Sequence, residues 1–148
     1  MKSIVIIILM LFSLQLKAQF SDFIVLVGPK FNFNFGNSQH RFSGGLEVSA
    51  WTFSNTNIPF GADFGFEFER DRCRIYSEIQ AGAFLGLSAG PVLELTRDTH
   101  TLGFQGSAWA AIFLGVDMRY RRINATNYFA PGIFFKVPVL TKGDFGLF

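Results

Sequence analysis

The chain of 148 residues contains a single cysteine, Cys73, so no disulfide can form within it. Its formal net charge is only +2, and basic residues are interleaved with acidic ones, which gives no basis for nucleic-acid binding. Helical periodicity is missing beyond residue 18, as are linkers and low-complexity tracts. These absences indicate one domain, built from β-strands, whose stability does not depend on disulfides.

Residues 1–18 are predicted to form a secretory signal peptide that is cleaved before Gln19. Lys2 supplies the positive start, residues 4–16 the apolar stretch and Ala18 the small residue before the cut. The apolar stretch is shorter than the roughly 20 residues of a transmembrane helix. An N-terminal buried strand or a retained anchor is the alternative. The segment predicts export from the cytoplasm, with residues 19–148 forming the exported domain.

Phenylalanine and glycine are abundant, with 20 and 15 residues, and apolar residues follow a period of two. Over residues 58–68 every even position is apolar, and the parity reverses after Arg70 and Asp71. Because side chains alternate along a strand, this pattern predicts two strands joined by a hairpin. The expected pairs are Glu69–Arg72, Glu67–Arg74 and Gly65–Tyr76 on the polar face, with Phe68–Cys73 and Phe66–Ile75 on the apolar face.

The same alternation continues from Phe23 to Leu140 and predicts eight strands with short connections. Turns are expected at residues 36–40, 54–57, 70–71, 84–86, 97–101, 113–115 and 123–127. Two of these, at 84–86 and 113–115, interrupt runs that are too long for one strand, since about 9–11 residues span a membrane. The tail at 141–148 is either a last short strand or irregular.

The apolar face must point either into a closed barrel or away from it. An eight-stranded barrel has an interior just wide enough for side chains, and the apolar set, rich in Phe, is too bulky for that space. The middle of the apolar face also carries no charge, as a lipid-facing surface requires. We therefore predict an all-β fold, an eight-stranded antiparallel up-and-down transmembrane β-barrel. A soluble, secreted, lipocalin-like carrier with apolar residues inside is the alternative.

A signal peptide, eight alternating strands, a charged lumen and the terminal aromatic Phe148 resemble the small outer-membrane β-barrels of Gram-negative bacteria, the OmpA/OmpX type. The resemblance covers residues 20–148 and is architectural. It implies an outer-membrane location with both termini in the periplasm. It also implies contact with outer-membrane lipid, and with the barrel-assembly machinery during biogenesis, and no cofactor. Prolines within or near strands predict bulges or rim positions; these are Pro59, Pro91, Pro131 and Pro138.

Charges of both signs share the polar face and are expected to neutralise one another in the lumen, because an unpaired buried charge is costly. The predicted ion-pair network comprises Glu47, Asp63, Glu67, Arg74, Glu78, Glu94, Asp117, Arg119, Arg121 and Lys136. Asp63 and Glu78 should face each other, either as a proton-sensitive or ion-conducting constriction or as a structural cluster neutralised by arginines. Trp109 should lie opposite Arg119 in a cation–π contact. A lumen filled in this way would conduct little or not at all.

His40 and His100 fall in predicted outer turns, with Ser38, Ser43 and Thr101 nearby in the sequence. A Ser–His pair at the rim would suit a hydrolase or acyltransferase acting on outer-membrane lipid. However, the sequence has no nucleophile motif, and no acidic residue is placed to orient either histidine. We therefore predict no catalytic residue, metal ligand or cofactor site, and we favour a structural role in the envelope over the barrel enzyme.

Overall fold

A computed structural model of the whole chain describes residues 23–36, 39–53 and 58–142. The predicted signal peptide, the predicted turn at 54–57 and the last six residues lie outside this description. The described strands are β1 (Phe23–Gly36), β2 (Gln39–Thr52), β3 (Phe60–Glu69), β4 (Arg72–Gly82), β5 (Leu85–Thr96), β6 (His100–Ala110), β7 (Leu114–Ile123), β8 (Thr126–Phe135) and β9 (Val137–Lys142). Among these residues no helix is long and apolar enough to cross a lipid bilayer.

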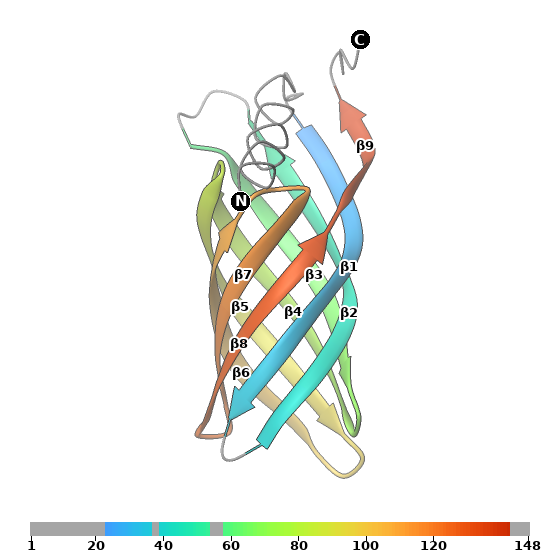
Figure 1. Cartoon of the computed structure of the whole chain (residues 1–148), viewed down its shortest axis with the longest axis vertical. Coiled ribbons are helices and arrows are strands. Elements are labelled where there is room, and N and C mark those ends of the chain that lie inside the picture. The colour runs from blue at the N-terminus through green and yellow to red at the C-terminus, as the bar shows by residue number, and fades with distance from the viewer. Residues whose placement is uncertain (1–22, 37–38, 54–57, 143–148) are drawn as a thin grey trace, which may run out of the picture.

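The strands form one closed antiparallel barrel (Figure 1). Each strand from β1 to β7 pairs with the next, and β1 also pairs with β8 and β9, which closes the sheet. The end where β1 begins and β9 ends is the proximal end. The β3–β4, β5–β6 and β7–β8 turns lie at the opposite, distal end.

Together β8 and β9 make up the eighth strand of the barrel, so the predicted strand number is confirmed. They run end to end along β1, with Lys30 paired to Phe134 and Val27 paired to Val137. A register shift follows, at the point where Leu26 pairs with Pro138. Proline has no backbone N–H to donate to the ladder. The irregularity expected near this proline is therefore present, and the paired strand extends to Lys142.

The hairpin between β3 and β4 has the predicted register throughout, from Glu69 opposite Arg72 to Phe66 opposite Ile75. Its two faces separate sharply. Phe64 and Phe68 are 56% and 57% exposed, whereas Glu67 is 2% exposed.

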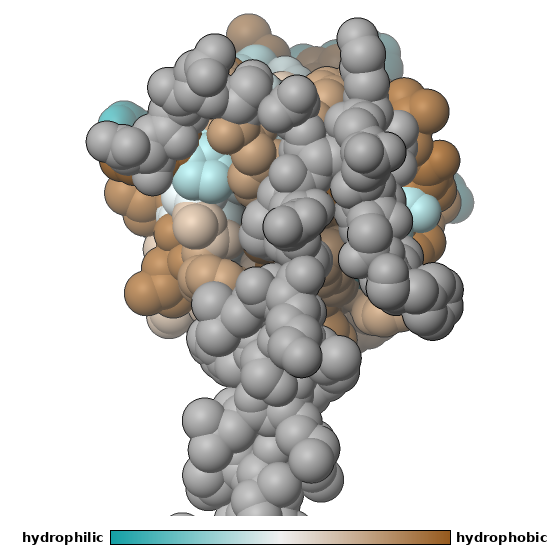
Figure 2. All heavy atoms as spheres, turned by 90° about the horizontal axis from the view of Figure 1, so that it is seen from above, coloured by the Kyte–Doolittle hydropathy of each residue, from teal (hydrophilic) through white to brown (hydrophobic). Residues whose placement is uncertain are grey.

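Most of the barrel follows the same rule, with apolar residues outside and polar residues inside; buried apolar residues such as Leu26 and Trp51 near the proximal end are exceptions. Seen from the proximal end, hydrophobic residues dominate the rim of the described part (Figure 2). The carrier alternative needs an apolar lumen and an exterior suited to water. In the described strands most of the lumen is instead polar or charged and the exterior is apolar, so this alternative is wrong.

Two of the predicted turns are displaced because glycine has another role there. In the first, β4 ends at Gly82, which pairs with Gly86 and adopts a positive φ of 143°, and β5 already begins at Leu85, so the connection is Ala83–Phe84 rather than 84–86. In the second, β6 ends at Ala110 and β7 already begins at Leu114. Gly115 thus lies within a strand, where a Cβ would approach the ring of Phe134 to 2.5 Å.

Candidate functional site: the filled lumen

The lumen contains three layers of side chains along its length. From the distal end these are a distal cluster, an inner cluster and a proximal plug. The distal cluster comprises Glu67, Glu69, Glu94, Arg72, Arg74 and Arg121. The inner cluster comprises Lys30, Glu47, Asp63, Glu78, Asp117, Arg119 and Lys136. The proximal plug comprises Ile24, Leu26, Trp51, Trp109, Ile112 and Phe134.

Glu67 on β3 organises the distal cluster. Its carboxylate accepts hydrogen bonds from Arg121 across the lumen, including one of 2.9 Å to Oε1. Ser43 donates to the same oxygen at 2.6 Å, and Asn32 donates to Oε2 at 2.8 Å. These donors come from β7, β2 and β1. A single carboxylate therefore joins four strands, and the cluster depends on all of them being in register.

Arg74 extends this cluster toward the distal rim. Its guanidinium donates to Glu69 at 2.9 Å and to Glu94 at 2.8 Å, and it also contacts Glu67 at 3.2 Å. The same group lies 5.4 Å from the ring centroid of Tyr128. The distal cluster contains three carboxylates and three guanidinium groups. It is therefore formally neutral.

Glu47 on β2 is the centre of the inner cluster. Lys136 lies 2.5 Å from its Oε1, while Lys30 and Arg119 each lie 3.2 Å from its Oε2. The buried hydroxyl of Tyr76 donates to Oε2 at 2.6 Å. One carboxylate thus faces three cations, which a buried charge needs if it is to remain ionised away from water.

Arg119 bridges Glu47 and Glu78, at 3.2 and 3.1 Å, and stacks 4.4 Å from the ring centroid of Tyr76. The predicted contact with Trp109 is wrong. In the β6–β7 ladder Trp109 lies opposite Asp117, whereas Arg119 lies opposite Ser107, two pairs farther along. The cation–π partner comes instead from across the barrel, on β4.

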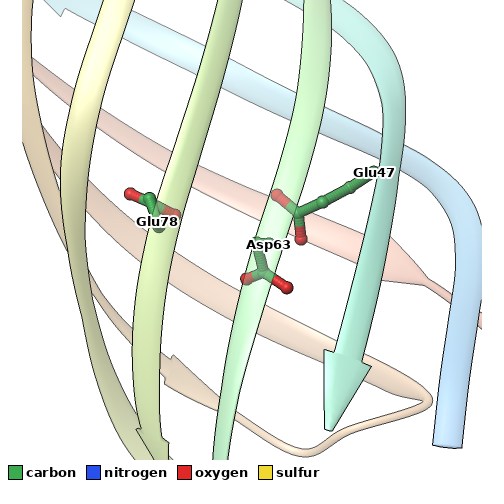
Figure 3. A group of neighbouring side chains, drawn as sticks. All are labelled: Glu47, Asp63 and Glu78. Atoms are coloured by element: carbon green, nitrogen blue, oxygen red, sulfur yellow. The ribbon is translucent and has the colours of Figure 1, made fainter.

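Asp63 and Glu78 are paired in the β3–β4 ladder, and with Glu47 they place carboxylate oxygens within 4.8 Å of one another (Figure 3). Such a trio has ligands suited to a hard cation. However, Arg119 already bridges two of the carboxylates, and Lys136 lies 3.8 Å from the third. A metal ion would have to displace these cations. The described geometry is that of an ion-pair cluster.

The inner cluster has four carboxylates and three cations, so it carries one formal negative charge in excess. Neutral donors surround the acids with the fewest cations. Gln80 donates to Asp63 at 2.6 Å, while Ser88 and Gln105 donate to Glu78 at 3.1 and 3.0 Å. Hydrogen bonds to an ionised group are among the stronger ones in proteins.

The proximal plug closes the lumen without charge. Trp51 and Trp109 meet edge to face with ring centroids 5.4 Å apart, and Leu26 of β1 is fully buried in the same cluster. The space between the plug and the inner cluster is about 10 Å³, close to the volume needed by one water molecule. Trp109 Nε1 has no hydrogen-bond partner here. This end of the lumen is packed with side chains.

All ten residues of the predicted network are buried and face the lumen. Further members were absent from that prediction although they share its parity. They are the charged residues Lys30, Glu69 and Arg72 and the uncharged residues Asn32, Asn34, Ser43, Tyr76, Gln80, Ser88 and Gln105. Neutral polar residues on the lumen parity were the available signal, since a filled barrel needs donors as well as charges.

The histidines lie on the other face of the wall. His40 is exposed and packs edge-on against Phe35, with ring centroids 5.2 Å apart. Ser43, by contrast, points into the lumen and bonds to Glu67. His100 begins β6 on the exterior parity, opposite Leu95. The Ser–His pairs within the described residues are therefore separated by the barrel wall, and Ser38 lies outside them.

No protein-family model and no curated protein matches the sequence. Among solved structures, a de novo designed transmembrane β-barrel shares 14% identity, with 81% of this chain covering 99% of that one at a TM-score of 0.46. Neisserial surface protein A shares 15% identity with this chain; the match covers 79% of this chain and 98% of that protein, with a TM-score of 0.42. Ail, the attachment invasion locus protein of Yersinia pestis, shares 10% identity; the match covers 80% of this chain and 100% of Ail, with a TM-score of 0.38. Likeness at this level concerns barrel architecture alone.

Proposed function

We propose that this protein is an integral outer-membrane β-barrel whose lumen is sealed, with a structural role in the envelope. The observation that supports this most is the distribution of charge across the wall. Among strand residues with described side chains, Arg122 is the one Asp, Glu, Lys or Arg on the exterior, and it lies near the distal end of β7. A charge at the bilayer midplane would cost about 2–4 kcal/mol, and this exterior avoids it.

Exposed aromatic and aliphatic side chains cover the exterior between the rims. In water a surface of this kind would promote association. In a bilayer it is the expected surface, because lipid tails are equally apolar. The closed barrel also leaves no unpaired sheet edge for water to satisfy. The exterior and the closure are therefore explained together by insertion into a membrane.

The two charged clusters and the plug support a sealed lumen. From the distal end, ions would have to pass the paired Arg121 and Glu67, then the bridging Arg119, and then the packed tryptophans. We therefore expect no conductance from the folded protein in a planar bilayer. Discrete channel openings from the wild-type protein would contradict the sealed lumen while leaving the membrane location intact.

Fractionation of cells tests the location. The protein should appear with the outer membrane and should migrate faster on a denaturing gel when it is not boiled, because an intact barrel resists unfolding. Recovery in the soluble periplasmic or extracellular fraction would overturn the proposal. The barrel enzyme gains no support from the positions of His40, His100 and Ser43.

A further inference from the structure

The exterior of the barrel has a groove of about 580 Å³ over strands β4 to β7. One row of neighbouring residues crosses it, running Ile79–Ala89–Gly106–Tyr120 from strand to strand. Ile79 and Tyr120 are 60% and 52% exposed and form the two walls. Ala89 and Gly106 between them form the floor. The next row toward the proximal end continues the groove through Ala108, between Leu87 and Met118.

Close packing inside the barrel does not explain why residue 106 is a glycine. A Cβ there would meet only the carbonyl oxygen of Ser88, at 3.2 Å. At Gly65 and Gly115, which face the lumen, a Cβ would come within 2.4 and 2.5 Å of an aromatic ring. Glycine also weakens a strand interior because it has no side chain to pack. The effect of glycine at this exterior position is to keep the groove open.

A cation lies just beyond the distal end of the groove. Arg122 follows Tyr120 on the same face of β7 and pairs with Phe104 of β6. Its exposed side chain forms no ion pair or hydrogen bond with the described residues. The β5–β6 hairpin extends past the end of the β6–β7 ladder, since the last pair is Gly103 with Ile123 and β6 begins at His100. Arg122 therefore lies beside the wall formed by this longer hairpin.

We propose that the groove and Arg122 together bind one phosphate-bearing membrane lipid, with an acyl chain on the Ala89–Gly106–Ala108 floor and the phosphate at the guanidinium. The chain would be contacted by Ile79 and Leu87 on one side and by Tyr120 and Met118 on the other. Such a channel offers more dispersion contacts than a flat wall. A guanidinium pairs with phosphate through two parallel hydrogen bonds. Among the described side chains Arg122 has no charged partner, and the rest of the strand exterior is uncharged, so it fits an anionic headgroup better than it fits a second copy of this chain.

This inference rests on the proposed membrane insertion. The test uses the purified full-length barrel in detergent, with phosphatidylglycerol added at increasing concentrations and bound lipid counted by native mass spectrometry. Arg122→Gln removes the charge, and Ala89→Leu/Ala108→Leu fills the groove. Arg70→Gln, at the exposed β3–β4 turn, is the control for charge. Ala62→Leu, in the same exterior row beyond Ile79, is the control for volume.

We expect the wild type to retain one phosphatidylglycerol more strongly than the rest, with Arg122→Gln and Ala89→Leu/Ala108→Leu each weakening it about tenfold. Both controls should stay within about twofold of the wild type. Equal binding by all variants would overturn the proposal and indicate non-specific surrounding lipid. A dimer lost on filling the groove would identify a second copy as the occupant. Membrane fractionation of the same variants separates these outcomes from a failure of membrane insertion, which would leave every variant in the soluble fraction.

Discussion

Two parts of one lumen are filled in opposite ways. The distal and inner clusters use buried charges joined across strands, such as Glu67 with Arg121 and Glu47 with Lys136. The proximal plug uses Leu26 and paired tryptophans with no charge. Ion pairs require particular partners at particular positions, whereas an apolar plug requires only volume and shape. The charged clusters therefore specify the register of the strands, and the plug excludes water at the proximal end.

The largest loss of stability is expected where a buried charged pair loses one member. Glu67→Leu would leave Arg121 and Arg74 buried without their shared carboxylate, and breaking a buried pair typically costs about 3–5 kcal/mol. Urea unfolding in lipid vesicles, followed by tryptophan fluorescence, measures this change. The matched variant Glu67→Leu/Arg121→Met removes both partners and should recover part of the loss. The single variant Arg121→Met completes the cycle. If the losses of Glu67→Leu and Arg121→Met simply add up in the double variant, the two residues do not act as a pair.

A cavity in the plug should cost somewhat less. Leu26 is fully buried, and Leu26→Ala should lower the free energy of unfolding by about 2–4 kcal/mol. The matched control is Leu102→Ala, because Leu102 is 72% exposed on the exterior. Lipid or detergent can fill the space that this truncation leaves, so its effect should be smaller in the same urea titration. Equal losses at both positions would mean that the plug is not packed as a core.

Glycine-to-alanine substitutions should have a smaller effect, and one that differs between the lumen face and the exterior face of the wall. Gly65→Ala would bring a Cβ within 2.4 Å of the ring of Tyr76, whose hydroxyl donates to Glu47. Overpacking of this kind costs about 1–3 kcal/mol. Gly106→Ala on the exterior meets one carbonyl oxygen at 3.2 Å, so the wall should adjust to it easily. Unfolding measurements on both variants should differ by at least 1 kcal/mol, about the lower end of that cost; equal stabilities would contradict the close packing of Tyr76 on Gly65.

The sequence carries enough information to predict the faces and the local register. Period-two alternation separates Phe64 from Asp63, and complementary charges align Glu67 with Arg74 in the hairpin. Contacts across the lumen were not predictable in this way. The stacking of Arg119 on Tyr76 depends on how far β4 and β7 are offset when the barrel closes, and no local pattern records that offset.

Glycine misled the prediction of turns for a related reason. The sequence predicts Gly86 and Gly115 in three-residue turns, because glycine at the left-handed position of such a turn preserves the alternation of the strands. The structure places both in strands, where a Cβ would come within 2.1 Å of the ring of Trp109 and 2.5 Å of the ring of Phe134. The aromatic rings of the plug therefore leave no room for a side chain at these two positions. Since the aromatic rings come from neighbouring strands, the requirement is invisible until the pairing is known.

The smallest effect is expected outside the lumen, at the pair of Arg41 and Asp71 on the distal rim. The hydrogen bond from Arg41 lowers the pKa of the Asp71 carboxyl below its usual value. A lowered pKa in the folded state stabilises the protein above the unfolded pKa, and this contribution is lost as the pH falls through the folded value. Because both groups are in water, salt screens the pair and its contribution is slight. Asp71→Asn should thus remove a small, salt-sensitive difference in stability between pH 3 and pH 7, the range around an ordinary Asp pKa of about 3.9. A loss as large as that of Glu67→Leu would show that the rim, like the lumen, depends on its charges, and the contrast between buried and exposed pairs would fail.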